Sequence, residues 1–302
     1  MNNIKYALYC LCFFGILFIF SCEDVVELEL EESPATLVVD AWINNKPEAQ
    51  TIRLTTTAPY FDATPTPGVS GATIVVSSTN GLIREFSDQG NGDYVWTPGA
   101  GENIGEIEEE FFLAIELDGK TYGSATVLNN VPPIDSITQV TEEEDAFSEE
   151  SIICNFFSRD LEGPGDTYWI KTFKNDQFLN QPLEINIAYD AGFSAGSEID
   201  NLVFITPIRE TMNPTADPND NADKSPSPWA VDDEVRVEIH SIDLAAYFYM
   251  LIVRDQLLNS LNGIFAEPLT NTKGNVVQLD GDEEVLGMFS VAAISELSYT
   301  IE

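Results

Sequence analysis

Short alternating runs of apolar and polar residues, each closed by a turn signal, fill the segment from Thr36 to Leu128. In the clearest run the apolar series is Leu37, Val39, Ala41 and Ile43, and the residues between are Val38, Asp40 and Trp42. The turn signals are Asn80-Gly81, Gly90-Asn91-Gly92-Asp93 and Asp118-Gly119, since glycine and asparagine tolerate positive φ. This pattern predicts about seven strands, arranged as an immunoglobulin-like or transthyretin-like β-sandwich over residues 35–130.

Two adjacent prolines, Pro132 and Pro133, interrupt the pattern because they forbid helix and block strand pairing. We place a domain boundary there and predict a second, β-rich domain over residues 134–302. Its one predicted helix spans about residues 242–261, with Ser241 as the cap and Asp243 favourable at the positive end of the helix dipole. Apolar residues recur there at helical spacing, namely Leu244, Phe248, Leu251, Leu258 and Leu261. The expected fold class is therefore mainly β, with this helix packed across a sheet.

The first 21 residues have the three parts of a secretory signal peptide. Lys5 supplies the positive charge, an apolar run extends from Tyr6 to Phe20, and the small Ser21 precedes the expected cleavage site. The run is shorter than the roughly 20 apolar residues of a spanning helix. Ile19, Ser21 and Cys22 resemble a bacterial lipobox, which predicts cleavage before Cys22 and acylation of its thiol by fatty acids such as palmitate. The alternative is an ordinary secreted protein whose apolar run ends in a cysteine.

Cysteine usage and charge limit what the mature chain can be. Cys10 and Cys12 leave with the signal and Cys22 takes the lipid, so Cys154 is left alone and an internal disulfide is excluded. The net charge of −38 disfavours nucleic acid and anionic headgroups as partners. Residues 22–34 carry six acids between Glu23 and Ser33. We interpret them as an extended acidic tether, either a surface-export signal like that of Bacteroidota lipoproteins or a solvated spacer.

Candidate ligand-contacting residues lie in or beside two proline-rich segments, Phe61 to Gly71 and Thr206 to Asp233. The segment from Thr206 to Asp233 has acidic and amide side chains at alternate positions, the spacing by which oxygen-rich loops wrap calcium: Asp217, Asn219, Asn221 and Asp223. Ala222 and Pro228 stand where an EF-hand has its glycine and bidentate acid, so a plain solvated loop is the alternative. No other cofactor is predicted. Trp229, Tyr60 and Phe61 are aromatic residues near these loops that either stack on a ligand or anchor the loop ends.

Signals of catalysis are absent from the sequence. His240 is the only histidine, and neither a Gly-x-Ser-x-Gly elbow, a phosphate-binding glycine loop nor a paired-cysteine metal motif occurs. We interpret His240 as a capping or buried-strand residue and Cys154 as a small buried hydrophobe. The chain is therefore predicted not to be an enzyme, and no catalytic residue is assigned.

Several motifs in order along the chain resemble one known family. They are Cys22 with its acidic tether, residues 37–43, Ala58-Pro59-Tyr60-Phe61, Val69-Ser70-Gly71-Ala72-Thr73, residues 131–137, Phe265 to Pro268, Gly274-Asn275 and Gly287-Met288-Phe289. Together they are similar to a Bacteroidota lipoprotein family known as domain of unknown function 4249. The resemblance implies an outer-membrane protein that is lipid-anchored and faces the cell exterior. It further implies a binding or accessory part in nutrient uptake by a TonB-dependent receptor. Two alternatives remain. The second hypothesis is a structural or adhesive surface protein, and the third is a hydrolase of a surface glycan or peptide.

Overall fold

The computed structural model describes residues 34–59, 64–144, 150–193, 199–215 and 227–302. Residues 35–302 form one compact unit. Among the described residues its secondary structure is mainly β with one long helix, which confirms the predicted fold class.

The first seven strands follow the predicted alternation and turns. They are β1 Leu37–Asn44, β2 Gln50–Thr56, β3 Thr73–Ser78, β4 Ile83–Gly90, β5 Asp93–Trp96, β6 Glu110–Leu117 and β7 Lys120–Val127. Neighbours in the sheet run β1-β2-β5-β4-β3-β6-β7, and every pair is antiparallel. The turns at Asn91-Gly92 and Asp118-Gly119 have positive φ at both residues, as their sequences predict. The inward side chains fill one apolar core, an arrangement that agrees with the predicted sandwich.

The middle of the chain adds a second group of strands. They are β8 Ile134–Glu142, β9 Ser151–Ser158, β10 Thr167–Lys174, β11 Gln177–Phe178, β12 Asn186–Tyr189 and β13 Glu234–Ser241, with a short 3-10 helix η1 at Pro182–Glu184. β8 and β9 pair with each other, whereas β10 pairs antiparallel with β11, β12 and β13. A second apolar core lies among these strands and contains Cys154, which is fully buried as expected.

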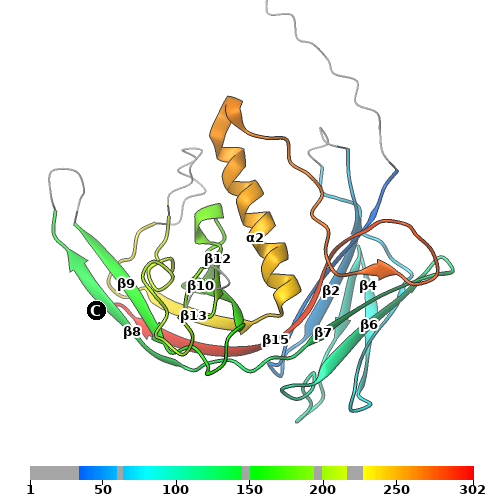
Figure 1. Ribbon diagram of the computed structural model, residues 1–302, viewed down its shortest axis with the longest axis horizontal. Coiled ribbons are helices and arrows are strands. Elements are labelled where there is room, and N and C mark those ends of the chain that lie inside the picture. The colour runs from blue at the N-terminus through cyan, green and yellow to red at the C-terminus, as the bar shows by residue number, and fades with distance from the viewer. Residues whose placement is uncertain (1–33, 60–63, 145–149, 194–198, 216–226) are drawn as a thin grey trace, which may run out of the picture. The chain divides into compact units, whose positions relative to one another are not determined.

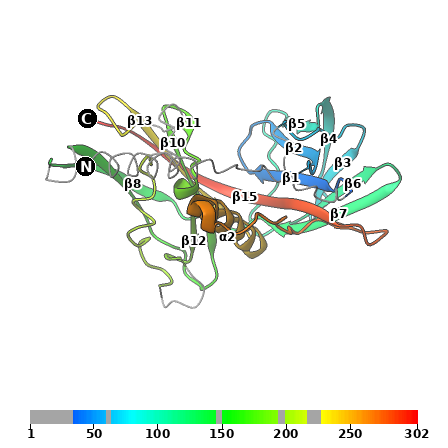
Figure 2. The same ribbon diagram turned by 90° about the horizontal axis from the view of Figure 1, so that it is seen from above.

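Strand β15, Val285–Thr300, belongs to both groups. Its first half pairs parallel with β1, from Leu37 opposite Val285 to Asn44 opposite Ala292. Its second half pairs antiparallel with β13, and Figure 2 shows it running between the two sets of strands. The sequence pattern predicts two closing strands here, Val285 to Ala293 and Leu297 to Ile301, and this is wrong because Ser295 and Glu296 between them continue the extended backbone. The short strand β14, Val277–Gln278, pairs with β7. The predicted boundary at residues 131–135 stays a prediction.

The predicted helix is present as α2, Leu244–Asn259, followed by a 3-10 turn η2, Ser260–Phe265. It packs against β10, β12 and β15, as expected, and Figure 1 shows it alongside β15. Its cap is Asp243, whose carboxylate accepts a hydrogen bond from the Ala246 amide at 2.8 Å, and not the predicted Ser241, which ends β13.

The apolar face predicted for α2 is correct only in part. It combines Leu244, Phe248, Leu251, Leu258 and Leu261 with Tyr247, Tyr249 and Met250. Ala246, Tyr247 and Met250 are buried, whereas Leu244 and Phe248 are 47% and 46% exposed. Apolar residues cover most of the helix circumference, so their spacing does not choose a face. The side that faces the sheet carries Ala246, whose small side chain allows close approach.

Candidate ligand-binding site

One face of the sheet carries the residues that alternate with the apolar core. In β1 the side chains of Val39, Ala41 and Ile43 enter the first core, so Asp40 and Trp42 point to the opposite face. The same alternation in β10 and β13 sends every second residue to that face. We call the set the polar-aromatic face: Asp40, Trp42, Trp169, Lys171, Phe173, Arg236, Glu238 and His240.

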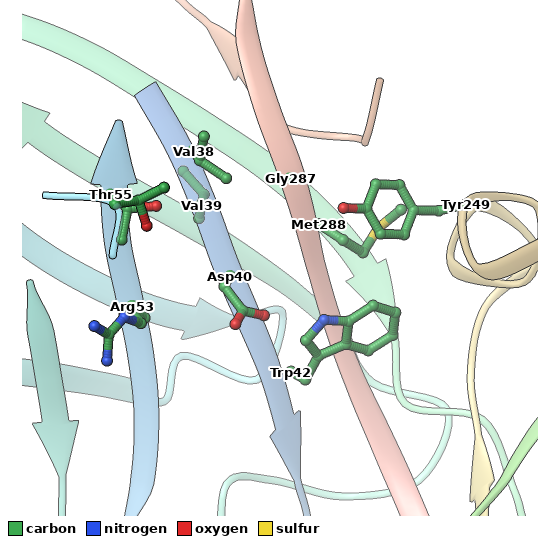
Figure 3. Close-up of a pocket in the computed structure, with 10 residues that line it drawn as sticks. Val38, Val39, Asp40, Trp42, Arg53, Thr55, Tyr249, Gly287 and Met288 are labelled. Atoms are coloured by element: carbon green, nitrogen blue, oxygen red, sulfur yellow. The ribbon is translucent and has the colours of Figure 1, made fainter. Parts of the chain in front are cut away.

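The first of two hollows on this face surrounds Trp42 and has a volume of about 350 Å³. Figure 3 shows Asp40 and Trp42 on β1, Arg53 on β2 and Tyr249 reaching from α2 toward Met288. The ring centroids of Trp42 and Tyr249 are 6.3 Å apart. Asp40 is exposed, and the Arg53 guanidinium is paired with Asp93 at 3.0 Å. This Trp42 hollow therefore has aromatic walls and one carboxylate open to solvent.

The second hollow has a volume of about 540 Å³ and surrounds Lys171. Its other lining residues are Asn44, Lys46, Glu48, Phe173, Arg236, Glu238, His240 and Glu296. Four of the chain's 13 lysines and arginines line the two hollows: Lys46, Arg53, Lys171 and Arg236. In a protein of net charge −38, this clustering of lysines and arginines makes the polar-aromatic face richer in positive charge than the rest of the chain.

Glu238 is the centre of the charges in the Lys171 hollow. Its Oε1 accepts a hydrogen bond from Lys46 Nζ at 2.9 Å and another from Arg236, and its Oε2 lies 2.9 Å from His240 Nε2. Burial alone would raise the pKa of this carboxyl, but the hydrogen bonds from His240 and Lys46 outweigh burial and hold the pKa at about 2. Glu238 is therefore ionised and satisfied by three donors.

His240 is buried on β13, which confirms the buried-strand interpretation. Burial and the nearby Lys171 together lower its pKa to about 4, against the opposing effect of Glu238. The ring is neutral at pH 7. Because an ionised carboxylate only accepts hydrogen bonds, we assign the proton to Nε2, which faces Glu238.

Lys171 lines the second hollow, and its ammonium group opposes the rise that burial causes in the pKa of Asp40 in the first. Its Nζ is 3.9 Å from the centroid of the Trp169 ring and 5.8 Å from that of Phe178. Among the described residues, no carboxylate lies within ion-pair distance of this ammonium group. Burial lowers its pKa to about 8, opposed by Glu238 and Asp40 and reinforced by Lys46. The residue is a partly desolvated cation held by aromatic faces.

The two tryptophans join the hollows. The rings of Trp42 and Trp169 meet edge to face with their centroids 5.1 Å apart, and Trp169 lies 6.2 Å from the His240 ring. Trp42 therefore lines one hollow while its partner supports the cation of the other.

The residues singled out from the sequence lie elsewhere. Trp229 is 5% exposed, and its Nε1 donates to Asn213 Oδ1 at 3.0 Å, so the structure places it as a core anchor. Cys22, Tyr60, Phe61, Asp217, Asn219, Asn221 and Asp223 lie outside the described residues. Within the part of the chain that the structure describes, no three side chains of the metal-binding types gather to hold an ion.

Sequence reasoning missed the polar-aromatic face. One signal was available, because Asp40 and Trp42 interrupt the same side of an otherwise apolar strand. The other residues come together only through the pairing of β10 with β13 and of β13 with β15, which local sequence does not reveal.

The fold and site together define a mainly β protein with an open charged and aromatic face. A family described as Domain of unknown function (DUF4249) matches residues 23–298, and the chain belongs to this family. No curated protein matches it. A membrane-crossing helix, long and apolar enough for that role, does not occur within the ranges that the structure describes.

Proposed function

We propose that this protein is a non-catalytic ligand-binding lipoprotein of the outer membrane, anchored through Cys22 with its body facing the cell exterior. In this proposal it serves a TonB-dependent receptor as an accessory component of nutrient uptake. The observation that carries the binding role is the Trp42 hollow, where Trp42, Tyr249 and the exposed Asp40 line one open cavity. Apolar walls with a few convergent polar groups are the usual composition of small-molecule sites.

Two titratable groups of the Lys171 hollow, Glu238 and His240, are poorly suited to proton transfer, which supports binding over catalysis. A general acid or base is most effective when its pKa is near the working pH. The pKa values of Glu238 and His240 are about 2 and about 4, so neither group exchanges a proton readily at neutral pH. Both are instead fixed by hydrogen bonding to each other, which suits a rigid recognition surface.

The anchor and the location rest on the sequence. The signal-like segment ends at Cys22 and is followed by acids, which supports lipidation and, in the Bacteroidota pattern, surface export. The receptor partner rests on what the family resemblance implies.

A crosslinked pull-down of the intact lipoprotein from detergent-solubilised outer membranes tests this proposal, with mass spectrometry as the readout. The matched control is Cys22→Ala, which keeps the folded body and removes the acylated thiol. Recovery of one TonB-dependent receptor with the wild type, and its loss with the control, is the expected result. Recovery of no such receptor under conditions that preserve known receptor complexes would overturn the uptake role and favour a structural or adhesive protein.

A further inference from the structure

We infer that the polar-aromatic face binds a zwitterionic ligand of the short-peptide class, with the ligand's carboxylate at Lys171 and its ammonium group at Asp40. This inference deepens the proposed function, since it names the kind of ligand that the Trp42 hollow and the Lys171 hollow would hold together.

Most charged groups of the two hollows are paired. Lys46 contacts Glu238 and Glu296, Arg53 contacts Asp93, and Arg236 contacts Glu238 and Asp176. Glu48, at the rim, accepts a hydrogen bond from the Asn44 side chain at 3.2 Å. Among the described residues, Lys171 and Asp40 are the charged groups of the two hollows that have neither a hydrogen bond nor an ion pair. The face therefore offers one unpaired cation and one unpaired anion.

Asp40 and Lys171 lie on the same face of the sheet, beside the tryptophan pair. Asp40 precedes Trp42 by two residues on β1, and Lys171 follows Trp169 by two residues on β10, so each charge lies beside one ring of the tryptophan pair and on the same face. Each charge contributes to the other's electrostatic environment, although the two groups do not form an ion pair. A short ligand can therefore reach both.

The charges around Lys171 and Asp40 disfavour ligands that carry only one charge. A simple anion at Lys171 would also meet Asp40 and Glu238, and a simple cation at Asp40 would meet Lys171 and Arg53. A zwitterion places the correct sign at each end. A dipeptide or tripeptide spans roughly 7–10 Å when extended. Its side chains would lie against Trp42, Tyr249 and Met288, which are the apolar walls of the Trp42 hollow.

The partial desolvation of Lys171 favours the binding of a ligand carboxylate. Its ammonium contacts aromatic faces and has no acceptor among the described residues, so a ligand carboxylate would supply a charge-assisted hydrogen bond that it lacks. Glu238 on β13, Asp40 on β1 and Lys46 contribute to the electrostatic environment of this ammonium, which in turn adds to the effect of burial in lowering the pKa of His240 on β13.

Calorimetric titration of the intact lipidated protein in detergent, at pH 7, tests this inference with three probes. Glycyl-leucine carries both charges, N-acetyl-glycyl-leucine lacks the ammonium, and glycyl-leucinamide lacks the carboxylate. Wild-type protein should bind glycyl-leucine, and each blocked probe should bind about tenfold more weakly or worse. Equal affinity for all three probes, or no binding of glycyl-leucine by folded protein, would overturn the inference.

Two variants make the assignment of each end specific. Lys171→Met should bind glycyl-leucine and glycyl-leucinamide equally, because the partner of the carboxylate is gone. Asp40→Asn should bind glycyl-leucine and its N-acetyl form equally. The matched controls are Lys120→Met and Asp118→Asn, which remove the same charges at positions outside the two hollows and should leave all three affinities unchanged. Loss of discrimination in the controls as well would mean that net charge, and not these two residues, selects the probe.

The outcome is separable from that of the pull-down. Failure to bind glycyl-leucine with a receptor still recovered would remove the peptide ligand and leave the proposed function standing. Peptide binding with no receptor recovered would support the peptide ligand and overturn the role in receptor-mediated uptake.

Discussion

The indole rings of Trp42 and Trp169 meet edge to face at 5.1 Å, although one belongs to the first described strand and the other to the tenth. The contact exists because β15 pairs with β1 through its first half and with β13, the neighbour of β10, through its second half. Strand β15 therefore places the two hollows of the polar-aromatic face next to each other, with the Trp42–Trp169 pair between them.

The close approach of β1 and β15 requires glycine at position 287. Gly287 has φ +99°, and a Cβ there would lie 1.9 Å from the Val39 carbonyl oxygen. Gly287→Ala should therefore lower the free energy of unfolding by more than about 3 kcal/mol, through strain and a backbone clash. The control is Gly101→Ala, where φ is +79° but the space is open, with an expected loss of about 1–2 kcal/mol. Urea unfolding of both variants measures the difference, and equal losses would contradict the packing argument.

The cap of α2 gives a contrast between two neighbouring residues. Asp243→Ala should destabilise the protein by about 1–2 kcal/mol, since the Ala246 amide and the buried Thr126 hydroxyl both lose their acceptor. Ser241→Ala should be neutral or slightly stabilising, because the Ser241 hydroxyl is buried and has no hydrogen-bond partner in the described structure. Thermal unfolding by circular dichroism distinguishes the two, and the opposite order would restore Ser241 as the cap.

Much of the fold was predictable from the sequence, and much of the site was not. Alternation over Leu37 to Ile43 and the Asp118-Gly119 turn depend on local sterics, so strands and turns could be recognised. The helix was also recognisable, but its cap was misplaced by two residues because Ser241 and Asp243 are both good capping residues. The neighbours of Lys171 were not predictable, since Trp169 lies on its own strand but Glu238 reaches it through one strand pairing and Asp40 through three.

Acidification should weaken the fold through Glu238. The pKa of its carboxyl is about 2 in the folded protein, below the ordinary value of about 4.3 in an unfolded chain. Its stabilising contribution is therefore complete above about pH 4.5 and is lost as the pH falls toward 2. Glu238→Gln should cost about 3 kcal/mol at pH 7, because Lys46 and Arg236 lose their buried carboxylate.

Urea unfolding of wild type and Glu238→Gln at pH 7 and pH 3 measures this effect. The gap between the two proteins should narrow at pH 3. Glu116→Gln, which neutralises an exposed carboxylate on β6, is the control and should follow the wild type. A gap of the same size at both pH values would show that Glu238 does not act through its charge.

Asp166 should have the opposite pH dependence. Burial raises its pKa to about 6, and the carboxylates of Asp160, Asp190 and Asp200 reinforce the shift. Since the folded pKa exceeds the unfolded value, the ionised group destabilises the fold above about pH 6, and this penalty disappears below about pH 4. Asp166→Asn should therefore raise the free energy of unfolding by about 1–2 kcal/mol at pH 7 and leave it unchanged at pH 3.5. Denaturant titrations at the two pH values check this, and a stabilisation that persists at pH 3.5 would contradict the electrostatic cause.

The most direct test of the account is the amount of TonB-dependent receptor recovered per mole of lipoprotein in the crosslinked pull-down, for wild type and for Cys22→Ala. The account predicts one receptor, recovered in near-constant proportion with the wild type and lost with the variant. Equal recovery from both proteins would contradict the lipid anchor as the basis of the association, and recovery from neither would contradict the role in uptake.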